Sequence, residues 1–452
     1  MLARGRQSGL LVLGDALWIV AAVPLAALIR LGPNTGTTTG GFLLGVGALN
    51  ACIFLAAFYY NDLYELRTLA QERALIVRVA RSLAAGMVLV ALAYYALPSL
   101  QVGRGILLLT AALVAGYAYA SRTALKVASQ AALHERILIL GAAATAQEIG
   151  REIAQRKKMG YDLVGFLDRP DGAADAPVVL GTFEDLAMIA ERERIDKVLV
   201  CVKDRRECLP FEQLLQLRLN GVEVEDGATF WEKLTGKVPV RDITPSWFIF
   251  GPGFRQPKMT LAMKRALDVV VSIFGILVTG PAMLATALAI RIDSPGPIFF
   301  QQERVGLKGR GFKLVKFRSM RADAESKSGP VWAQANDDRI TRVGRFIRKT
   351  RLDELPQFWN VLKGDMSLVG PRPERPFFVQ QLAKSIPYYE LRHVVRPGCT
   401  GWAQVKYRYG ASEEDSMQKL QYDLHYIKYL SIRRDLLVMF DTLKVMTLGE
   451  GR

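Results

Sequence analysis

Long apolar runs dominate the first 130 residues of the chain. Four of these runs reach the length of about 17 to 25 residues that a helix needs to cross a bilayer, and they cover residues 9–31, 41–60, 83–100 and 105–121. The pattern predicts a membrane domain of four transmembrane helices over residues 1–130. The first run is too long for a cleaved signal and another span follows closely, so we expect it to be retained.

Basic residues are distributed unevenly around these runs. They precede the first run, separate the second from the third and follow the fourth, at Arg4, Arg6, Arg67, Arg73, Arg78, Arg81, Arg122 and Lys126. The connector 33–40 carries none, and the short one near Gln101 carries only Arg104. Because basic loops stay in the cytoplasm, both ends of the domain are expected there. Asp15, inside the first run, is either a functional carboxylate or half of a structural pair.

Short apolar runs then alternate with helical patterns over residues 131–228. The strand 136–140 ends at Gly141, and further strands are predicted at 163–167 and 197–202. Alternation of this kind is typical of a parallel α/β sheet. It predicts a degenerate Rossmann-like cytoplasmic domain.

A dinucleotide would be the obvious ligand of such a domain, with Asp168 placed for a ribose contact. However, Ala143 and Ala146 stand where the dinucleotide-binding fingerprint has further glycines. We therefore expect a structural, regulatory or oligomerising domain without a bound cofactor.

A fifth apolar run, residues 268–290, follows a segment at 229–259 that is expected to be a linker. A straight transmembrane helix is one interpretation. The other is a re-entrant helix over 265–291, broken at Gly280 and Pro281, because proline interrupts a helix. Residues 301–351 contain 14 Lys plus Arg and 5 Asp plus Glu, a net charge of 14 − 5 = +9, which disfavours export. We expect the re-entrant form.

The most specific chemistry lies between Arg348 and Arg372. Asp353 and Glu354 form an adjacent carboxylate pair, and Pro371 and Pro373 restrict the backbone on either side of Arg372. Neighbouring residues on a helix point about 100° apart, so the two carboxylates are expected to divide their roles. One would be a nucleophile and the other would hold Mg²⁺. Guanidinium groups would offset the charge of a phosphate substrate.

Three further residues are candidates for substrate binding. Lys316 and Arg318 would contact donor phosphates, or instead pair with carboxylates at a strand edge. Trp402 would stack on a base or sugar, or instead fill the core beside neighbouring glycines.

These residues lie in five ordered motifs by which the chain resembles the bacterial sugar transferase family. The motifs are Gln302–Gly306, Phe312–Met320, Arg351–Gln357, Gly364–Pro373 and Arg396–Val405. The resemblance implies a membrane-associated α/β catalytic domain over residues 260–452 that carries a hexose 1-phosphate from a UDP-sugar to undecaprenyl phosphate and releases UMP. By resemblance Asp353 would be the nucleophile of a ping-pong mechanism and Glu354 would bind Mg²⁺. The large members of the family initiate exopolysaccharide or O-antigen repeat units in the bacterial inner membrane, with the catalytic domain on the cytoplasmic face.

The net charge and the cysteine content of the chain fit this interpretation but leave others open. A net charge of +16 suits an anionic membrane or phosphate-bearing substrates, and the apolar runs favour these over nucleic acid. The four cysteines lack the spacing of metal ligands. An exposed sheet edge would allow a homodimer. The main alternative is a membrane sensor or scaffold whose middle domain binds a nucleotide, and a glycosyltransferase that releases UDP is another.

Overall fold

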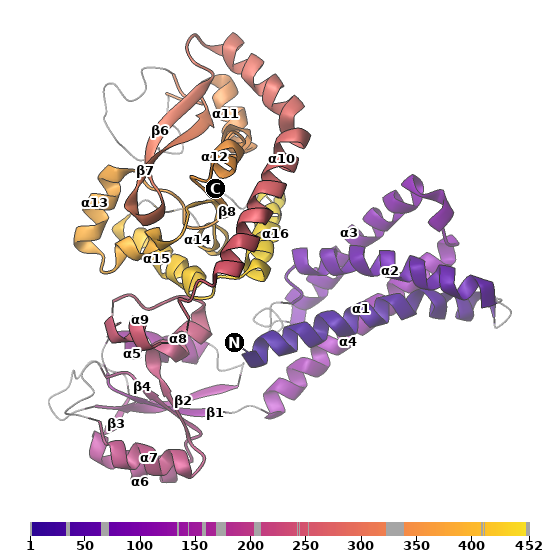
Figure 1. Ribbon diagram of the computed structural model, residues 1–452. Helices are drawn as coiled ribbons and strands as arrows, with labels where there is room; N and C mark the ends of the chain where they lie inside the picture. Colours follow the sequence, from indigo (N-terminus) through magenta and orange to yellow (C-terminus); the bar gives the residue numbers. More distant parts are fainter. Residues whose placement is uncertain are drawn as a thin grey trace. The chain divides into compact units, whose positions relative to one another are not determined.

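The computed structural model describes residues 2–32, 37–64, 72–132, 135–142, 144–155, 160–168, 178–202, 209–241, 243, 245–251, 253–321, 339–407, 410 and 412–448. The chain divides into two compact units, Met1–Gly227 and Ala228–Arg452 (Figure 1).

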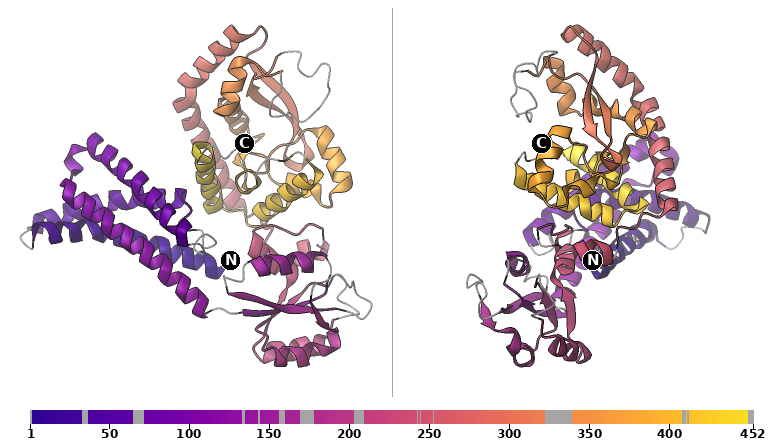
Figure 2. Two further views of the ribbon diagram at one scale, coloured as in Figure 1. Left: turned by 180° about the vertical axis from the view of Figure 1, so that it is seen from behind. Right: turned by 60° about the vertical axis from the view of Figure 1, so that its left-hand side comes forward.

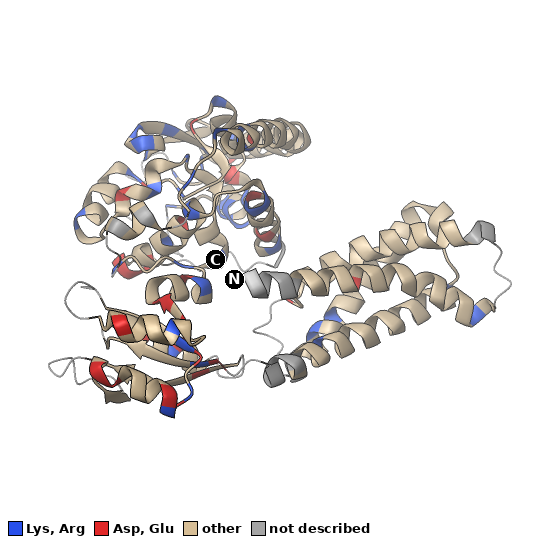
Figure 3. Ribbon diagram, turned by 60° about the horizontal axis from the view of Figure 1, so that its bottom comes forward, with Lys and Arg blue, Asp and Glu red and all other residues tan. Residues whose placement is uncertain are grey.

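The first unit begins with four long helices: α1 (Leu2–Leu31), α2 (Thr37–Tyr60), α3 (Glu72–Ala96) and α4 (Arg104–Ala132). Each contains a stretch long and apolar enough to cross a membrane, and Figure 3 shows few charged residues along them. Small residues allow the helices to approach closely. A side chain at Gly47 of α2 would lie 2.5 Å from the carbonyl oxygen of Val20 in α1.

Asp15 of α1 forms a buried ion pair with Arg122 of α4. The two guanidinium Nη atoms each lie 2.6 Å from one carboxylate oxygen, and the Tyr64 hydroxyl donates to the same carboxylate at 2.9 Å. Both charged side chains are almost fully buried. The contacts support the structural interpretation of Asp15, because the carboxylate is compensated within the protein.

A parallel sheet of five strands follows, in the order β3-β2-β1-β4-β5. Its strands are β1 (Glu135–Leu140), β2 (Tyr161–Leu167), β3 (Val179–Gly181), β4 (Lys197–Val200) and β5 (Glu223–Asp226). The helix α5 (Ala144–Gln155) covers one face, and α6 (Leu186–Arg192) and α7 (Phe211–Leu219) cover the other (Figure 2). The expected parallel α/β sheet is thus present. Ala143, one of the two fingerprint alanines, lies outside the described residues, and Ala146 is buried.

The second unit packs most of its elements around a large apolar core. It contains an antiparallel pair, β6 (Phe299–Val305) with β7 (Gly311–Phe317), and a parallel pair, β8 (Ser367–Val369) with β9 (Gly398–Thr400). Its helices are α8 (Gly227–Thr235), α9 (Pro245–Phe250), α10 (Lys258–Asp293), α11 (Arg342–Lys349), α12 (Gln357–Lys363), α13 (Pro376–Ser385), α14 (Trp402–Lys406), α15 (Glu413–Lys428) and α16 (Ile432–Leu448).

The segment 229–259, expected to be a linker, belongs to this unit. It contains α9 and most of α8, and Val238 and Val240 are fully buried in the core. Glu232 forms an ion pair with Lys428 at 2.6 Å. The apolar side chains of the segment pack in the same core as Leu420 and Leu424 of α15, so it is not a free linker.

The fifth apolar run forms α10, a single helix of 36 residues with Pro281 inside it. The expected break at Gly280 and Pro281 is absent, and Figure 1 shows a bend in α10 instead. A proline inside a helix removes one hydrogen bond and crowds the preceding turn, which produces a kink when the rest of the helix is well supported.

Both halves of α10 pack against the second unit. In the first half, Asp268 accepts hydrogen bonds from the Ser367 hydroxyl and the Leu368 amide, at 3.0 and 2.9 Å. Near the other end, Ile290 packs in a buried cluster with Phe317 and Ile347. The outer face of the helix remains exposed and apolar, at Val270, Ile273, Phe274, Leu277, Val278, Leu284 and Leu288.

Candidate active site

A tight turn places the carboxylate pair between α11 and α12. The helix α11 ends at Lys349 and is capped by Thr350, and Arg351 adopts a left-handed backbone conformation with φ of 59°. Asp353 and Glu354 follow in the short 3₁₀ helix η6 (Leu352–Glu354). The reversal of the chain at Arg351 brings both carboxylates next to β7.

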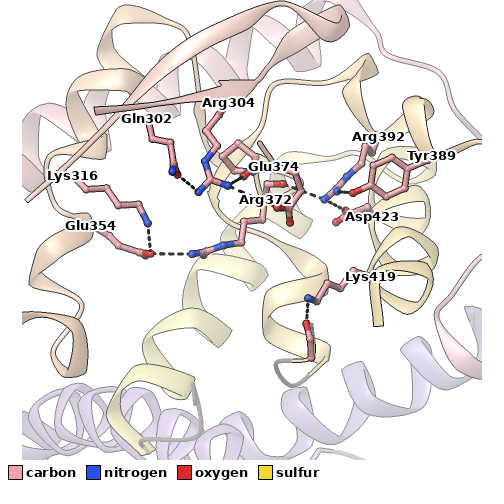
Figure 4. A network of polar contacts seen from close by, with 12 residues as sticks. Gln302, Arg304, Lys316, Glu354, Arg372, Glu374, Tyr389, Arg392, Lys419 and Asp423 are labelled. Atoms are coloured by element: carbon pink, nitrogen blue, oxygen red, sulfur yellow. Dashed lines mark hydrogen bonds and ion pairs between the residues drawn. The ribbon is translucent and has the colours of Figure 1, made fainter. Parts of the chain in front are cut away.

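Glu354 is surrounded by cations. Its Oε1 atom lies 3.2 Å from both Lys316 Nζ and Arg372 Nη2 (Figure 4). Arg351 Nη1 lies 4.0 Å from the same atom. Burial acts to raise the pKa of Glu354, but Lys316, Arg372 and Arg351 outweigh it and hold the pKa well below its usual range. Glu354 is therefore a carboxylate in the folded protein.

Asp353 lies in a different environment although it is the next residue. Its side chain is 8% exposed, and its Oδ1 atom is buried without a hydrogen-bond partner among the described residues. Burial, followed by the charge of Glu354, raises the pKa of Asp353 to about 6, against the opposing charges of Lys316, Arg351 and Arg348. The negative charge of Glu354 is thus balanced by neighbouring cations, whereas Asp353 presents an oxygen without a hydrogen-bond partner among the described residues.

Backbone packing holds Arg372 at this site. The strand β8 leads into Gly370, where a side chain would lie 2.4 Å from the carbonyl oxygen of Arg396. Only glycine allows this close approach between the two segments, which belong to two of the motifs identified in the sequence. Arg372 follows two residues later and extends its guanidinium to Glu354.

The structure brings most of the predicted site residues together. Lys316 from β7 and Arg372 contact Glu354 directly. Arg348 of α11 acts on Asp353 through its charge, which opposes the rise in the pKa of that carboxyl.

Two predicted residues have other partners. Arg318 is 4% exposed, and its Nη atoms donate to the carbonyl oxygens of Ser294 and Pro295 at 2.7 and 2.8 Å. It therefore secures the C-terminal end of α10. Trp402 packs against the core with its ring 6.2 Å from that of His425, which supports the interpretation of Trp402 as a core residue.

Sequence reasoning did not single out Arg351 or Cys399 as members of the site. Arg351 adjoins the carboxylate pair, and its place in that motif was the available signal. Burial, followed by the charge of Glu354, raises the pKa of the Cys399 thiol to about 12, so Cys399 stays protonated at neutral pH.

The carboxylate pair also suits a divalent cation. Among the described residues, no group of three or more His, Cys, Asp or Glu side chains is placed to hold a metal ion. Mg²⁺ does not require such a group, because it is commonly held by one or two carboxylates with water and phosphate oxygens. The unpaired Oδ1 of Asp353 beside Glu354 fits this second type of site.

Comparisons with known proteins agree with a chain that combines long apolar helices with a site suited to phosphate groups. Residues 259–449 match the family model described as bacterial sugar transferase, and residues 60–213 match a model described as CoA-binding domain. One relative is the UDP-glucose:undecaprenyl-phosphate glucose-1-phosphate transferase of Xanthomonas campestris pv. campestris. It is 32% identical over 70% of this chain and 67% of its own length. The chain belongs to the bacterial sugar transferase family.

Other relatives match over different shares of their length. The UDP-N-acetylgalactosamine-undecaprenyl-phosphate N-acetylgalactosaminephosphotransferase of Aeromonas hydrophila is 40% identical over 63% of this chain and 62% of its own length. The exopolysaccharide production protein PSS of Rhizobium leguminosarum bv. phaseoli is 40% identical over 43% of this chain and 100% of its own length. The match to the Aeromonas protein therefore spans about three fifths of that relative.

Proposed function

We propose that the protein transfers a hexose 1-phosphate from a UDP-sugar to undecaprenyl phosphate and releases UMP. The observation that carries the proposal is the contrast between Glu354, compensated by three cations, and Asp353, whose Oδ1 is unpaired. The names of the relatives supply the substrate class. Initiation of an exopolysaccharide or O-antigen repeat unit is the corresponding biological role.

In the first half-reaction, an oxygen of Asp353 attacks the sugar-bearing phosphorus of the UDP-sugar. An Asp–phosphorus bond forms, the bond to the bridging oxygen breaks, and UMP leaves with that oxygen. In the second, an oxygen of undecaprenyl phosphate attacks the same phosphorus. The Asp–phosphorus bond then breaks, which restores the carboxylate and yields the lipid diphosphate sugar.

The cations around the pair have a definite task in this mechanism. Lys316 and Arg372 face Glu354 from β7 and from the segment after β8, so a diphosphate arriving there would meet both charges. Positioning and charge compensation provide most of the catalysis in phosphoryl transfer. Glu354 is the residue that would hold Mg²⁺, which would supply further positive charge to the phosphate oxygens.

The contacts of α10 support a re-entrant placement in the cytoplasmic leaflet. Lys264 near its start forms a buried ion pair with Asp435, and Ile290 near its end packs against Phe317 and Ile347. Both ends are thus attached to one compact unit, whereas the exposed apolar face between them suits lipid. This placement would hold the catalytic unit at the cytoplasmic face of the bacterial inner membrane, at the depth of lipid phosphates.

The proposal is tested with the full chain in membranes or detergent. The protein is incubated with Mg²⁺, undecaprenyl phosphate and a panel of UDP-sugars, and the released nucleotide is identified. We expect UMP from at least one donor and none from the Asp353→Asn variant. Release of UDP would identify an ordinary glycosyltransferase, and the absence of any nucleotide release from the unmutated protein would favour a sensor or scaffold.

A covalent intermediate gives a second, independent readout. Radiolabelled donor without the lipid acceptor should leave label on the unmutated protein and none on Asp353→Asn. Transfer that continues after Asp353→Asn would contradict the assigned nucleophile. Arg310 is exposed in the turn between β6 and β7. Arg310→Gln also neutralises one charge, so it serves as the control and should keep the label.

A further inference from the structure

The segment that carries Arg372 is held through its backbone carbonyl groups. We call residues 371–374 the Arg372 loop. Pro371 and Pro373 have no amide hydrogen to donate, so the carbonyls are the main polar groups by which the loop is anchored. All four are bonded, two of them to backbone amides: Pro371 O accepts from Gly398 N, and Glu374 O accepts from Val305 N, both at 2.9 Å.

The two central carbonyls of the loop are bonded to arginine side chains. Arg392 Nη2 donates to the carbonyl oxygen of Arg372 at 3.1 Å, and Arg304 Nη1 donates to that of Pro373 at 3.0 Å (Figure 4). These arginines come from η7 (Tyr389–Val394) and β6, which are distant from the loop in sequence.

Each of the two arginines is itself fixed. Arg392 is 5% exposed, donates to Asp423 at 2.8 Å and to the Tyr389 hydroxyl at 2.6 Å. Arg304 donates to the Gln302 side chain and lies 3.8 Å from Glu374. A planar guanidinium can serve several acceptors in a fixed geometry, which the single ammonium group of lysine cannot do.

We propose that Arg392 and Arg304 are positioning residues for the reaction, acting by holding the Arg372 loop so that the Arg372 guanidinium faces the carboxylate pair. The inference rests on the proposed function for its catalytic consequence. A loop held at four consecutive carbonyls leaves Arg372 only its side-chain rotations, so its charge is already in place when a phosphate arrives.

Hydrogen exchange tests the restraint without any need for activity. Arg372 and Glu374 carry the only backbone amides within the loop, since its other two residues are prolines. Arg392→Lys keeps the charge beside Asp423, and Arg304→Gln removes the second contact. We expect each variant to raise exchange in the peptide covering the loop at least fivefold and to leave the peptide from α12 unchanged. Wild-type exchange in both variants would overturn the proposal.

A double-mutant cycle then tests the catalytic consequence. Arg392→Lys should lower kcat for UMP release about tenfold with little change in KM, and in an Arg372→Lys background it should have almost no further effect. Residues that act through one another are non-additive in this way. If the double variant instead lowers kcat by the product of the two single factors, Arg392 does not act through Arg372 and the positioning role is overturned.

The control has the same chemistry at another place. Arg265 also donates to two carbonyl oxygens, those of Val361 and Leu362, at 2.6 Å each, but not to the loop. Any effect of Arg265→Lys should multiply with that of Arg372→Lys. If Arg392→Lys does not fold, the pair change Arg392→Met with Asp423→Leu removes both buried charges together. If the unmutated protein releases no UMP, the proposed function fails, and the exchange result still decides whether the loop is held.

Discussion

Lys316 Nζ lies 3.2 Å from Glu354 Oε1, the same atom that Arg372 contacts at the same distance. The carboxylate of Glu354 therefore occupies two cations that the proposed reaction assigns to substrate phosphates. This contact keeps the cationic groups close together, although their charges repel one another.

Neutralising Glu354 should separate binding from turnover. In Glu354→Gln, Lys316 and Arg372 lose their carboxylate partner, so a diphosphate ligand no longer competes with it. We expect UDP to bind about tenfold more tightly in the presence of EDTA, equivalent to about 1.4 kcal/mol, while UMP release with Mg²⁺ falls at least a thousandfold. Calorimetry or filter binding measures the first effect. Unchanged or weaker binding of UDP would show that Glu354 does not compete for these cations.

The buried pair of Lys264 and Asp435 should anchor the first half of α10. Lys264 Nζ lies 2.7 Å from Asp435 Oδ2, and both side chains are almost completely buried. Removing one partner of such a pair typically costs about 3–5 kcal/mol, because the other charge remains buried. Lys264→Met should therefore lower the free energy of unfolding in detergent by about that amount. Adding Asp435→Leu should restore most of the loss.

An exposed lysine on the same helix provides the control for this experiment. Lys258→Met, in the first turn of α10, should change the free energy of unfolding by less than about 0.5 kcal/mol, as expected of a surface substitution. Equal effects of the two lysine changes would mean that the buried pair does not stabilise the attachment of α10.

The re-entrant placement of α10 predicts that both of its ends lie on one side of the membrane. Met259 and Ile292 are 71% and 87% exposed, so single cysteines there are accessible in a cysteine-free background. In spheroplasts, a membrane-impermeant maleimide should label neither Met259→Cys nor Ile292→Cys until the membrane is opened. Thr37→Cys, at the start of α2, should be labelled from outside. Labelling of Ile292→Cys from outside would establish a spanning helix.

The sequence predicted the chemistry of the site better than its geometry. The motif order identified Asp353, Glu354 and Arg372, and the structure brings Arg372 to the pair. Lys316 and Arg318 looked equivalent, because they are two positions apart and carry the same charge. Their partners differ since Lys316 lies in β7 beside Glu354, whereas Arg318 follows the strand and meets the end of α10. Such partners are set by tertiary packing, which no local pattern reports.

The same limit applies to the fold. Runs of apolar residues were enough to predict the helices α1 to α4 and the three central strands of the sheet. They did not reveal β5, because its sequence Glu-Val-Glu-Asp lacks an apolar run, and β5 is defined by pairing with β4. Arg304 and Arg392 escaped notice for a related reason. Their role depends on carbonyl groups 69 and 20 positions away.

Stability should depend on pH through the buried side chain of His425. This ring is fully buried, and neither nitrogen has a hydrogen-bond partner within the described part of the chain. Burial, followed by the charges of Arg434 and Lys428, lowers the pKa of His425 to about 3. Glu232 lies 3.9 Å from the ring and would favour the protonated form, but it is already paired with Lys428 at 2.6 Å.

Because the pKa of His425 is lower in the folded protein than in the unfolded chain, the unfolded chain binds a proton first as the pH falls. The contribution of neutral His425 to stability is therefore complete above about pH 6.5 and is lost as the pH falls toward 3, by up to about 1.4 kcal/mol per pH unit. His425→Phe keeps an aromatic ring beside Trp402 but cannot be protonated. Between pH 7.5 and 4.5 the unfolding free energy of the unmutated protein should fall by about 2–3 kcal/mol relative to this variant, measured by denaturant unfolding in detergent. Parallel pH profiles for the two proteins would mean that His425 is not held neutral by its surroundings.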